Sequence, residues 1–460
     1  MGGLPAQERV RETKMKMGAS EEYTMHRASP EALAAIHVEP TNEKVRRSLE
    51  LIEEFDNRAL RIFLDICSKC GACAQQCHTY LGTEDPKNIP AGRANLLRKV
   101  YKRHFTTTGR LFGSLVGAED MTEEVLEDWY RYFYQCNECR RCAVFCPFGI
   151  DTSEITAIAR QILTSIGMVP KYIADVVENV HKSGNNIGIP EAAWLNNCAF
   201  LEEEIRDETG EEVKIPVNQE ADVLYVPPSA DLFVNADTMI GVAKVFHAAG
   251  ANWTTSTHAG EAANFGLFYD ANAMRILNRR VVDEARRLGA KKVVFGECGH
   301  GWRVAKNFTT ELNYGVEFEI VNILEYTAEL IGRGRIRVDP GANGDPVTYH
   351  DPCNMARGAG LIEEPREILR AVVEDFREMS PNREMSYCCG GGGGLLTDEL
   401  MEFRMKAGGP KAESIEATEA KVVVAPCAIC KAQLPLVMEH YDLDAQVSGV
   451  MDLVGRALVI

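Results

Sequence analysis

The chain has 460 residues, of which 45% are hydrophobic and 25% charged, so it can bury ordinary globular cores and is not disordered along its length. Its formal net charge of −17 argues against nucleic acid and anionic lipid as partners, because both bind basic faces. No stretch of 18 apolar residues is present and the N-terminus lacks the apolar core of an export signal, so we expect neither a membrane span nor secretion.

The first part of the chain is expected to be helical. Residues 1–44 show no clear period, and we interpret them as an extended N-terminal arm or a disordered tail. From residue 45 onward, apolar residues recur at helical spacing, for example over 152–166. We therefore predict a mostly helical domain over residues 45–200, followed by an acidic linker at 202–210.

The second part alternates strands and helices. Short β-branched runs stand at 223–226, 292–295, 347–349 and 421–424, and each is followed within three residues by a Pro or Gly. Pro365 is expected to open a helix whose apolar stripe runs to Phe376. The spacing of the runs repeats, so we predict two similar α/β domains over residues 218–335 and 340–460. The fold class is therefore α plus α/β.

Cysteine is the residue type that indicates the chemistry. The chain has 15 cysteines, and without an export signal their grouping indicates metal binding in a reducing cytosol. Two groups share the spacing C-x2-C-x2-C-x3-C: Cys67, Cys70, Cys73 and Cys77, then Cys136, Cys139, Cys142 and Cys146. Structural zinc is the alternative, but zinc takes paired C-x2-C knuckles and does not explain a third cysteine at equal spacing.

The two runs are typical of cubane 4Fe–4S clusters. In two-cluster ferredoxins the last cysteine of each run binds the other cluster. We therefore assign Cys67, Cys70, Cys73 and Cys146 to one cubane cluster, and Cys136, Cys139, Cys142 and Cys77 to a second. Crossed ligation of this kind would bring the two clusters near enough for electron transfer.

A third group holds five cysteines: Cys353, Cys388, Cys389, Cys427 and Cys430. Its three segments follow predicted strands or begin turns, so we expect them to converge at one edge of a sheet. Five thiolates exceed what a cubane takes. Glycines at 390–394 follow the adjacent pair, and their backbone N–H groups could approach a sulfide or a bound thiol closely.

These segments resemble a known family. His350-Asp351-Pro352-Cys353, Cys388-Cys389-Gly390 and Pro426-Cys427-x2-Cys430 match the motif of the CCG domain in heterodisulfide-reductase-type subunits. The resemblance implies that the five cysteines are catalytic and bind one non-cubane 4Fe–4S cluster at which disulfides are cleaved. The alternative is a structural zinc or cubane site without catalysis.

The first α/β repeat departs from the motif. Ser229, Gly260-Glu261 and Gly301 stand where the second repeat has cysteines, and only Cys298 is kept. One thiol cannot hold the cluster, so we expect one degenerate and one intact CCG domain. By pseudo-symmetry, His300 is expected to face a substrate pocket between the two repeats, near the turn of five glycines, and to donate a proton to the leaving thiolate. The alternative is a loop histidine with a structural hydrogen bond.

A fused ferredoxin part with one degenerate repeat resembles DsrK-type subunits of the sulfite-reductase-associated DsrMKJOP membrane complex, with TmcB and HdrD subunits as further relatives. This implies a cytoplasmic oxidoreductase acting on sulfur groups, held on the inner face of the membrane by partner subunits. It would pass electrons between a quinone-linked b-type cytochrome (DsrM-like) and the disulfide or trisulfide of a small sulfur carrier (DsrC-like) in dissimilatory sulfur metabolism. The alternative function is electron relay for a flavoprotein such as a glycolate or lactate oxidase.

Overall fold

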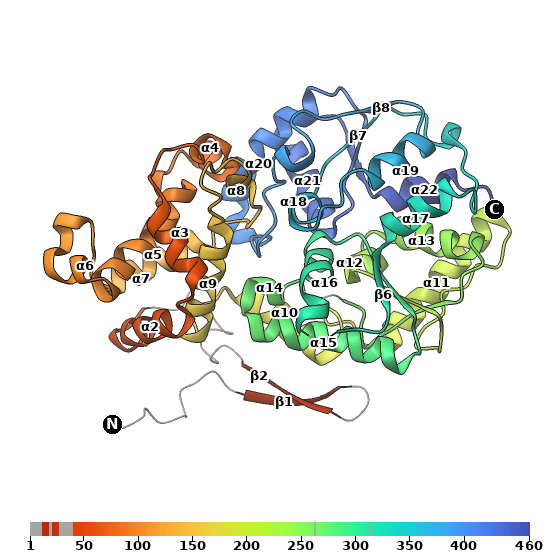
Figure 1. The fold of residues 1–460 in the computed structure, drawn as a ribbon. Helices are drawn as coiled ribbons and strands as arrows, with labels where there is room; N and C mark the ends of the chain where they lie inside the picture. Colours follow the sequence, from red (N-terminus) through yellow and green to blue (C-terminus); the bar gives the residue numbers. More distant parts are fainter. Residues whose placement is uncertain (1–11, 18–20, 27–39, 262–263, 313–314) are drawn as a thin grey trace.

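The structure is a computed structural model that describes residues 12–17, 21–26, 40–261, 264–312 and 315–460 (Figure 1). Of the arm predicted over residues 1–44, the described part includes strands β1 (Glu12–Met17) and β2 (Glu21–His26), which pair antiparallel, and the beginning of the first helix. The remainder of that prediction lies outside the described residues.

The next part of the chain is helical. Its elements are α2 (Asn42–Phe55), α3 (Arg58–Ile66), η1 (Ala74–Gln76), α4 (His78–Thr83), η2 (Pro86–Asn88), α5 (Pro90–Phe105), α6 (Thr107–Phe112), η3 (Gly113–Val116), α7 (Glu123–Phe133), α8 (Arg141–Val144), α9 (Thr152–Ser165) and α10 (Lys171–Ser183). Side chains of Thr41, Asn57 and Thr122 cap three of these helices. Trp129 and Ile155 are fully buried in a core that these helices share with Phe265, Phe268 and other residues of the following α/β part. This core positions the two ferredoxin-type cysteine runs.

The prediction of a linker at residues 202–210 is wrong. Helix α11 runs over Glu191–Thr209 and its acidic end is helical. Trp194, Cys198, Leu201 and Ile205 form a buried stripe along it, and this stripe packs into the core of the α/β part. The acidic residues lie on the opposite, exposed face, so charge alone did not indicate a break in the helix.

Two four-stranded parallel sheets form the second half of the chain (Figure 1). The first has β3 (Val223–Val226), β4 (Trp253–Thr255), β5 (Lys292–Phe295) and β6 (Glu319–Asn322) in the order β4-β3-β5-β6. The second has β7 (Val347–Tyr349), β8 (Phe376–Arg377), β9 (Val422–Val424) and β10 (Gln446–Ser448) in the order β10-β9-β7-β8. In each sheet the first and third segments of the repeat are the central, adjacent strands, so the two sheets are built alike.

Helices surround both sheets. They are α12 (Ser229–Phe233), α13 (Ala236–Ala248), α14 (Gly266–Tyr269), α15 (Ala271–Arg287), α16 (Gly299–Leu312), α17 (Ile323–Gly332), α18 (Cys353–Ala359), α19 (Glu364–Val372), α20 (Met401–Glu416), α21 (Ala428–His440) and α22 (Val450–Ala457), with short turns η4 (Pro340–Ala342), η5 (Arg383–Met385) and η6 (Asp398–Leu400). Helices α13 and α22 join the repeats at Gly241, where a Cβ atom would lie 1.9 Å from the Met451 carbonyl oxygen. Within the described ranges, no helix is both long and apolar enough to cross a membrane.

Candidate metal centres

The five cysteines of the third group lie together at the carboxyl ends of β7 and β9. Cys353 begins α18 just after β7, and Cys427 caps α21 just after β9 with Cys430 one turn further on. Cys388 and Cys389 reach the same place from the loop after η5. All five are at most 7% exposed, and the Cys430 thiol lies 3.4 Å from that of Cys389. Five soft donors in one buried place fit an iron–sulfur site.

His350 is a neighbour of this site to which the sequence pattern assigned no separate role. A ligand atom of His350 lies within 4.8 Å of those of Cys389 and Cys430. The ring is fully buried at the end of β7, and burial lowers its pKa. The imidazole therefore stays neutral at physiological pH and can meet a thiolate site without adding charge.

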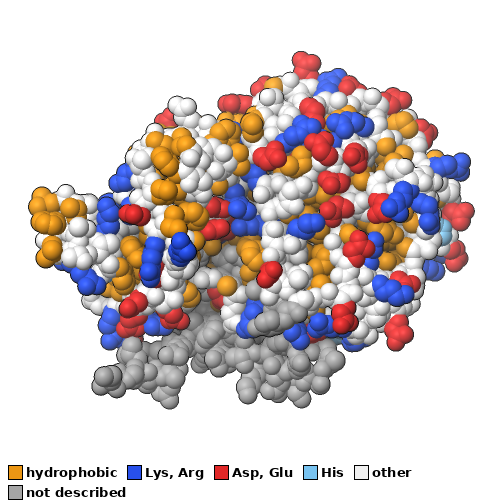
Figure 2. Space-filling view, in the orientation of Figure 1, with side chains coloured by type: hydrophobic (Ala, Val, Ile, Leu, Met, Phe, Trp, Pro, Cys, Tyr) orange, Lys and Arg blue, Asp and Glu red, His pale blue; other side chains and the backbone are white. Residues whose placement is uncertain are grey.

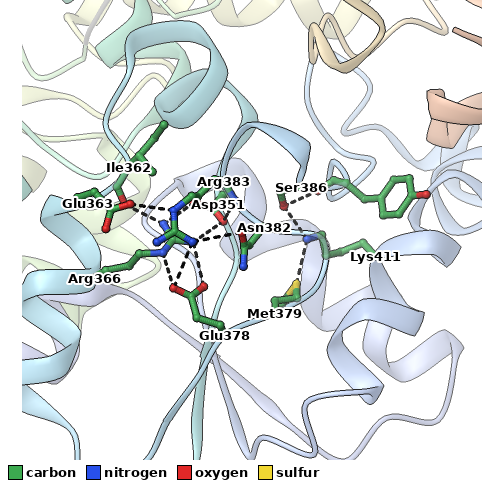
Figure 3. Close-up of polar contacts among 11 residues, drawn as sticks. Asp351, Ile362, Glu363, Arg366, Glu378, Met379, Asn382, Arg383, Ser386 and Lys411 are labelled. Carbon is green, nitrogen blue, oxygen red and sulfur yellow. Dashed lines mark hydrogen bonds and ion pairs between the residues drawn. The ribbon is translucent and has the colours of Figure 1, made fainter. Parts of the chain in front are cut away.

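An arginine at the start of α19 holds two of the cysteine segments together (Figure 3). Arg366 donates both terminal nitrogens to the Asp351 carboxylate, at 2.8 and 2.9 Å, and also pairs with Glu378. Asp351 lies two residues before Cys353, and it also accepts the backbone N–H of Arg383. This network ties the Cys353 segment to the loop that leads into Cys388.

A buried lysine supports the other side of that loop. The Lys411 ammonium on α20 donates to Ser386 Oγ at 2.9 Å and to Met379 Sδ at 3.0 Å (Figure 3). Burial lowers its pKa to about 8. Lys411 was missed by sequence reasoning, because a single lysine on a helix, distant in sequence from the cysteine pair, carries no local signal.

His300 of the first repeat lies beside the five-cysteine site of the second repeat. The side chain is 3% exposed and stands over Phe268, with ring centroids 4.7 Å apart. The pKa of Cys427 is held well below its usual range, first by Cys430 and then by His300. A Cβ atom on Gly392 would lie 3.3 Å from His300 Nε2, so that nitrogen faces the five-glycine segment.

The ferredoxin-type cysteines form two separate groups in space. Burial raises the pKa of Cys73, and the nearby thiols of Cys67 and Cys146 raise it further. Burial likewise raises the pKa of Cys142, with further contributions from Cys139, Cys77 and Cys136. These last four thiols line one cavity. Each group draws one cysteine from the other run, and the donor sets fit two cubane clusters.

The second ferredoxin run abuts the five-cysteine site. Cys139 packs against the five-cysteine site, and the interaction between the Cys388 and Cys139 thiols lowers the pKa of Cys139 and raises that of Cys388. Asn137 Nδ2 donates to the carbonyl oxygens of Gly390 and Gly392 at 2.8 and 2.9 Å. Gly393 is required here for close packing, since a Cβ atom would lie 2.7 Å from the Cys136 carbonyl oxygen. The glycine segment therefore serves the contact between the two modules.

His78, left unassigned from the sequence, strengthens the same junction. Its Nδ1 donates to the Ala407 carbonyl oxygen at 2.9 Å, and the ring also lowers the pKa of Cys139. Arg160 adds bonds to the carbonyl oxygens of Gly393 and Cys136, at 2.8 and 2.7 Å. The junction is thus held by buried polar groups from both modules.

Asn137→Leu is expected to lower the free energy of unfolding by about 1–3 kcal/mol, because it leaves two buried carbonyl oxygens unpaired. It should also slow electron exchange between the second run and the five-cysteine site, measured by freeze-quench spectroscopy after mixing with a reductant. Asn307→Leu is the matched control, since Asn307 Nδ2 also bonds two carbonyl oxygens, those of Arg303 and Gly358. Equal slowing in both variants would contradict the prediction.

In the degenerate repeat, oxygen replaces sulfur. Ser229 Oγ donates to the Glu261 carboxylate at 2.5 Å, and the Ser229 backbone N–H donates to it at 3.0 Å. Cys298 remains, with its thiol accepting the backbone N–H of Gly301 at 3.4 Å. The local donor set of one thiol, one hydroxyl and one carboxylate does not fit an iron–sulfur cluster.

A cavity of about 700 Å³ lies beside the glycine segment. It lies where the glycine segment ends, between the ferredoxin helices and the loop after Gly394, and its lining includes Tyr130, Tyr134, Tyr172 and Leu396. The substrate pocket predicted between the two repeats, near the glycine segment, stays a prediction; the cavity meets that segment at Gly394. Elsewhere between the repeats, Lys431 packs against Asp231 and Glu297 as buried ion pairs.

A helical module with two ferredoxin runs, joined to α/β repeats with one five-cysteine site, defines the class of dicluster iron–sulfur proteins with a cysteine-rich domain. Family models agree: residues 63–150 match "4Fe-4S dicluster domain" and residues 347–435 match "Cysteine-rich domain". The chain belongs to the family of heterodisulfide-reductase-like (Hdr-like) iron–sulfur subunits.

The family is established by a relative from Archaeoglobus fulgidus, an "Hdr-like menaquinol oxidoreductase iron-sulfur subunit 2". It is 39% identical over 88% of this chain and 81% of the relative. One subunit of a "Dihydromethanophenazine:CoB--CoM heterodisulfide reductase" from Methanosarcina barkeri is 25% identical over 86% of this chain and 94% of the relative. An "EtfAB:quinone oxidoreductase" from Syntrophomonas wolfei is 25% identical over 81% of this chain and 54% of its own length.

Proposed function

We propose that this chain is the iron–sulfur catalytic subunit of a membrane-associated oxidoreductase complex, which passes electrons between a quinone-linked b-type cytochrome and a disulfide or trisulfide substrate. One observation carries the proposal: five buried cysteines lie together beside the second ferredoxin run. The names of relatives, a menaquinol oxidoreductase and a heterodisulfide reductase, support the two ends of this electron path.

The residues would hold three clusters. Cys67, Cys70, Cys73 and Cys146 would bind one cubane 4Fe–4S cluster, and Cys77, Cys136, Cys139 and Cys142 a second. Cys353, Cys388, Cys389, Cys427 and Cys430 would bind one non-cubane 4Fe–4S cluster. The grouping of the thiols in space supports this division. When bound, such clusters supply single electrons and, at the five-cysteine site, a place for substrate sulfur.

Reduction of a disulfide adds two electrons, breaks the S–S bond and yields two thiolates, one of which must take a proton. We infer that His300 carries that proton, because its Nε2 is buried and faces Gly392, and its ring lies beside Cys427. The substrate would approach from the cavity at Gly394, whose lining combines tyrosine rings with charged side chains such as Arg131 and Lys171. Lys411 would hold the Cys388 loop in place and add positive charge beside the thiolates.

The positions of the two runs support an order for the electron path. Cys70 of the first run is exposed, whereas Cys139 of the second lies against Cys388. The cytochrome partner, DsrM-like in this proposal, would therefore meet the first run. A small DsrC-type sulfur carrier would be the substrate, as in dissimilatory sulfur metabolism. The subunit would lie peripherally on the inner face of the membrane.

A second candidate function is electron relay for a flavoprotein. The similarity to an EtfAB:quinone oxidoreductase favours it, although this chain spans about half the length of that relative. In this case the five-cysteine site would pass electrons on without binding a sulfur substrate.

The test is electron paramagnetic resonance of the anaerobically purified, oxidised protein, with and without a reduced DsrC-type carrier or dithiothreitol. We expect a signal that changes with the thiol, because oxidised cubanes are silent. Cys389→Ser should abolish the change, and Cys298→Ser, the matched control in the degenerate repeat, should keep it.

A protein that carries all three clusters but shows no thiol-dependent signal would contradict sulfur chemistry and leave the relay function in the lead. Loss of the signal in Cys298→Ser as well would contradict the assignment of the site to the second repeat.

A further inference from the structure

Four exposed apolar side chains of the helical module, including its three most exposed, stand together at one tip of the molecule. We call residues 107–116, helix α6 and turn η3, the apolar projection. Leu111, Phe112, Leu115 and Val116 are 73, 54, 87 and 37% exposed. Figure 1 shows α6 at the far end of the helical module, away from both sheets, and Figure 2 shows a group of apolar side chains at the same place.

The projection is a folded feature. Gly109 lets α6 pack onto α5, since a Cβ atom there would lie 1.9 Å from the Lys102 carbonyl oxygen. Thr106 caps α6 by accepting the backbone N–H of Gly109 at 3.1 Å. Gly113 and Gly117 have positive φ angles of 51° and 71°, and the Ala118 backbone N–H closes the turn onto Gly113. The local backbone thus holds four apolar side chains outward.

Two cations at the base of the projection are left without a carboxylate among the described residues. Residues 86–118 contain seven Lys or Arg, of which Arg93 and Arg98 are buried and Lys87 and Lys99 pair with Asp128 and Glu119. At the base of the projection, Arg103 pairs with Asp120. Lys102 has no carboxylate partner in the part of the chain that the structure describes, and the Arg110 guanidinium bonds only the His104 carbonyl oxygen there.

We propose that the apolar projection binds directly to an anionic lipid surface. Its four apolar side chains enter the boundary between headgroups and acyl chains, while Lys102 and Arg110 face lipid phosphates. An apolar tip with two cations at its base, Lys102 and Arg110, fits this role, because contact with lipid depends on the charge of the face that meets it and not on the net charge of −17 of the whole chain. The inference goes beyond the proposed function, in which partner subunits supply the membrane contact.

The test is co-sedimentation of the full, cluster-loaded chain with vesicles, without any partner subunit. One vesicle is phosphatidylcholine alone, and the other contains about 30% phosphatidylglycerol. We expect binding to the anionic vesicles that weakens from about 0.1 M to about 1 M salt. The double variant Leu111→Ser and Leu115→Ser should bind at least about tenfold more weakly. Val234→Ser, which removes another apolar side chain that is 74% exposed, is the matched control.

Leu115→Trp gives a direct readout, because its emission should shift to shorter wavelength on anionic vesicles. Lys102→Glu with Arg110→Glu should remove the preference for anionic lipid. Binding that is absent, or equal in the double serine variant, would overturn the proposal. Wild-type binding only to membranes that contain the partner cytochrome, lost in the double variant, would also overturn it and assign the projection to a protein interface. None of these vesicle-binding results changes the thiol-dependent signal that tests the proposed function.

Discussion

Arg366→Met is expected to lower the free energy of unfolding by about 3–5 kcal/mol and to prevent assembly of the five-cysteine cluster. Arg366 is fully buried and donates to both oxygens of Asp351, which is itself 1% exposed. Methionine fills a similar volume but leaves the Asp351 carboxylate buried beside an apolar chain. The measurement is anaerobic urea unfolding followed by circular dichroism, with iron and sulfide determined for each preparation.

The loss should be local to the third cluster. Asp351 positions the segment that carries Cys353, and its bond to the Arg383 backbone positions the loop before Cys388. We therefore expect the iron content to fall by about one four-iron cluster. Arg383→Met is the control: its side chain is 34% exposed and pairs with exposed Glu363, and such pairs contribute about 0–1 kcal/mol. A full iron content in Arg366→Met would refute the positioning role.

Lys431→Met is expected to destabilise the protein by a similar amount, about 3–5 kcal/mol, by a different route. The Lys431 ammonium lies 2.6 Å from Asp231 and 3.3 Å from Glu297, and all three side chains are at most 3% exposed. Both acids belong to the first repeat and Lys431 to the second, so the ion pairs join the repeats. Removing the lysine leaves two buried carboxylates without their cation.

The effect should depend on pH in a defined direction. Burial raises the pKa of Glu297 to about 8 and that of Asp231 to about 6. When a carboxyl group has a higher pKa in the folded state than in the unfolded state, the folded protein becomes less stable as the pH rises, because the group ionises first in the unfolded chain. Without Lys431 both pKa values should rise further, so the variant should be less destabilised near pH 6 than near pH 8.

Two controls separate this network from general damage. Lys421→Met removes an exposed pair with Asp444 and should cost about 0–1 kcal/mol. Adding Asp231→Asn and Glu297→Gln to Lys431→Met should restore part of the stability, since no unpaired charge then remains buried. A triple variant no more stable than Lys431→Met would contradict the electrostatic explanation.

Several strands could not be predicted from the sequence. The predicted strands correspond to β3, β5, β7 and β9, which are central in their sheets and rich in β-branched residues. The strands that were missed, such as β4 and β8, have three and two residues and flank them. The helix after Pro365 was predicted to reach Phe376, but α19 ends at Val372 and Phe376 begins β8. Pairing with β7, a tertiary contact, outweighs the helical spacing there.

The sequence by itself determined the family and the fold class, because cysteine spacing and strand-turn-helix order are local patterns that the backbone must satisfy. Only the tertiary structure decided that Asn137 bonds to Gly390, that Arg366 and Lys411 hold the Cys388 loop, and that Lys431 joins the two repeats. Asn137 and Gly390, for example, are 253 residues apart. Buried polar side chains take whichever partners the packed modules bring to them, and no periodicity in the chain encodes that choice.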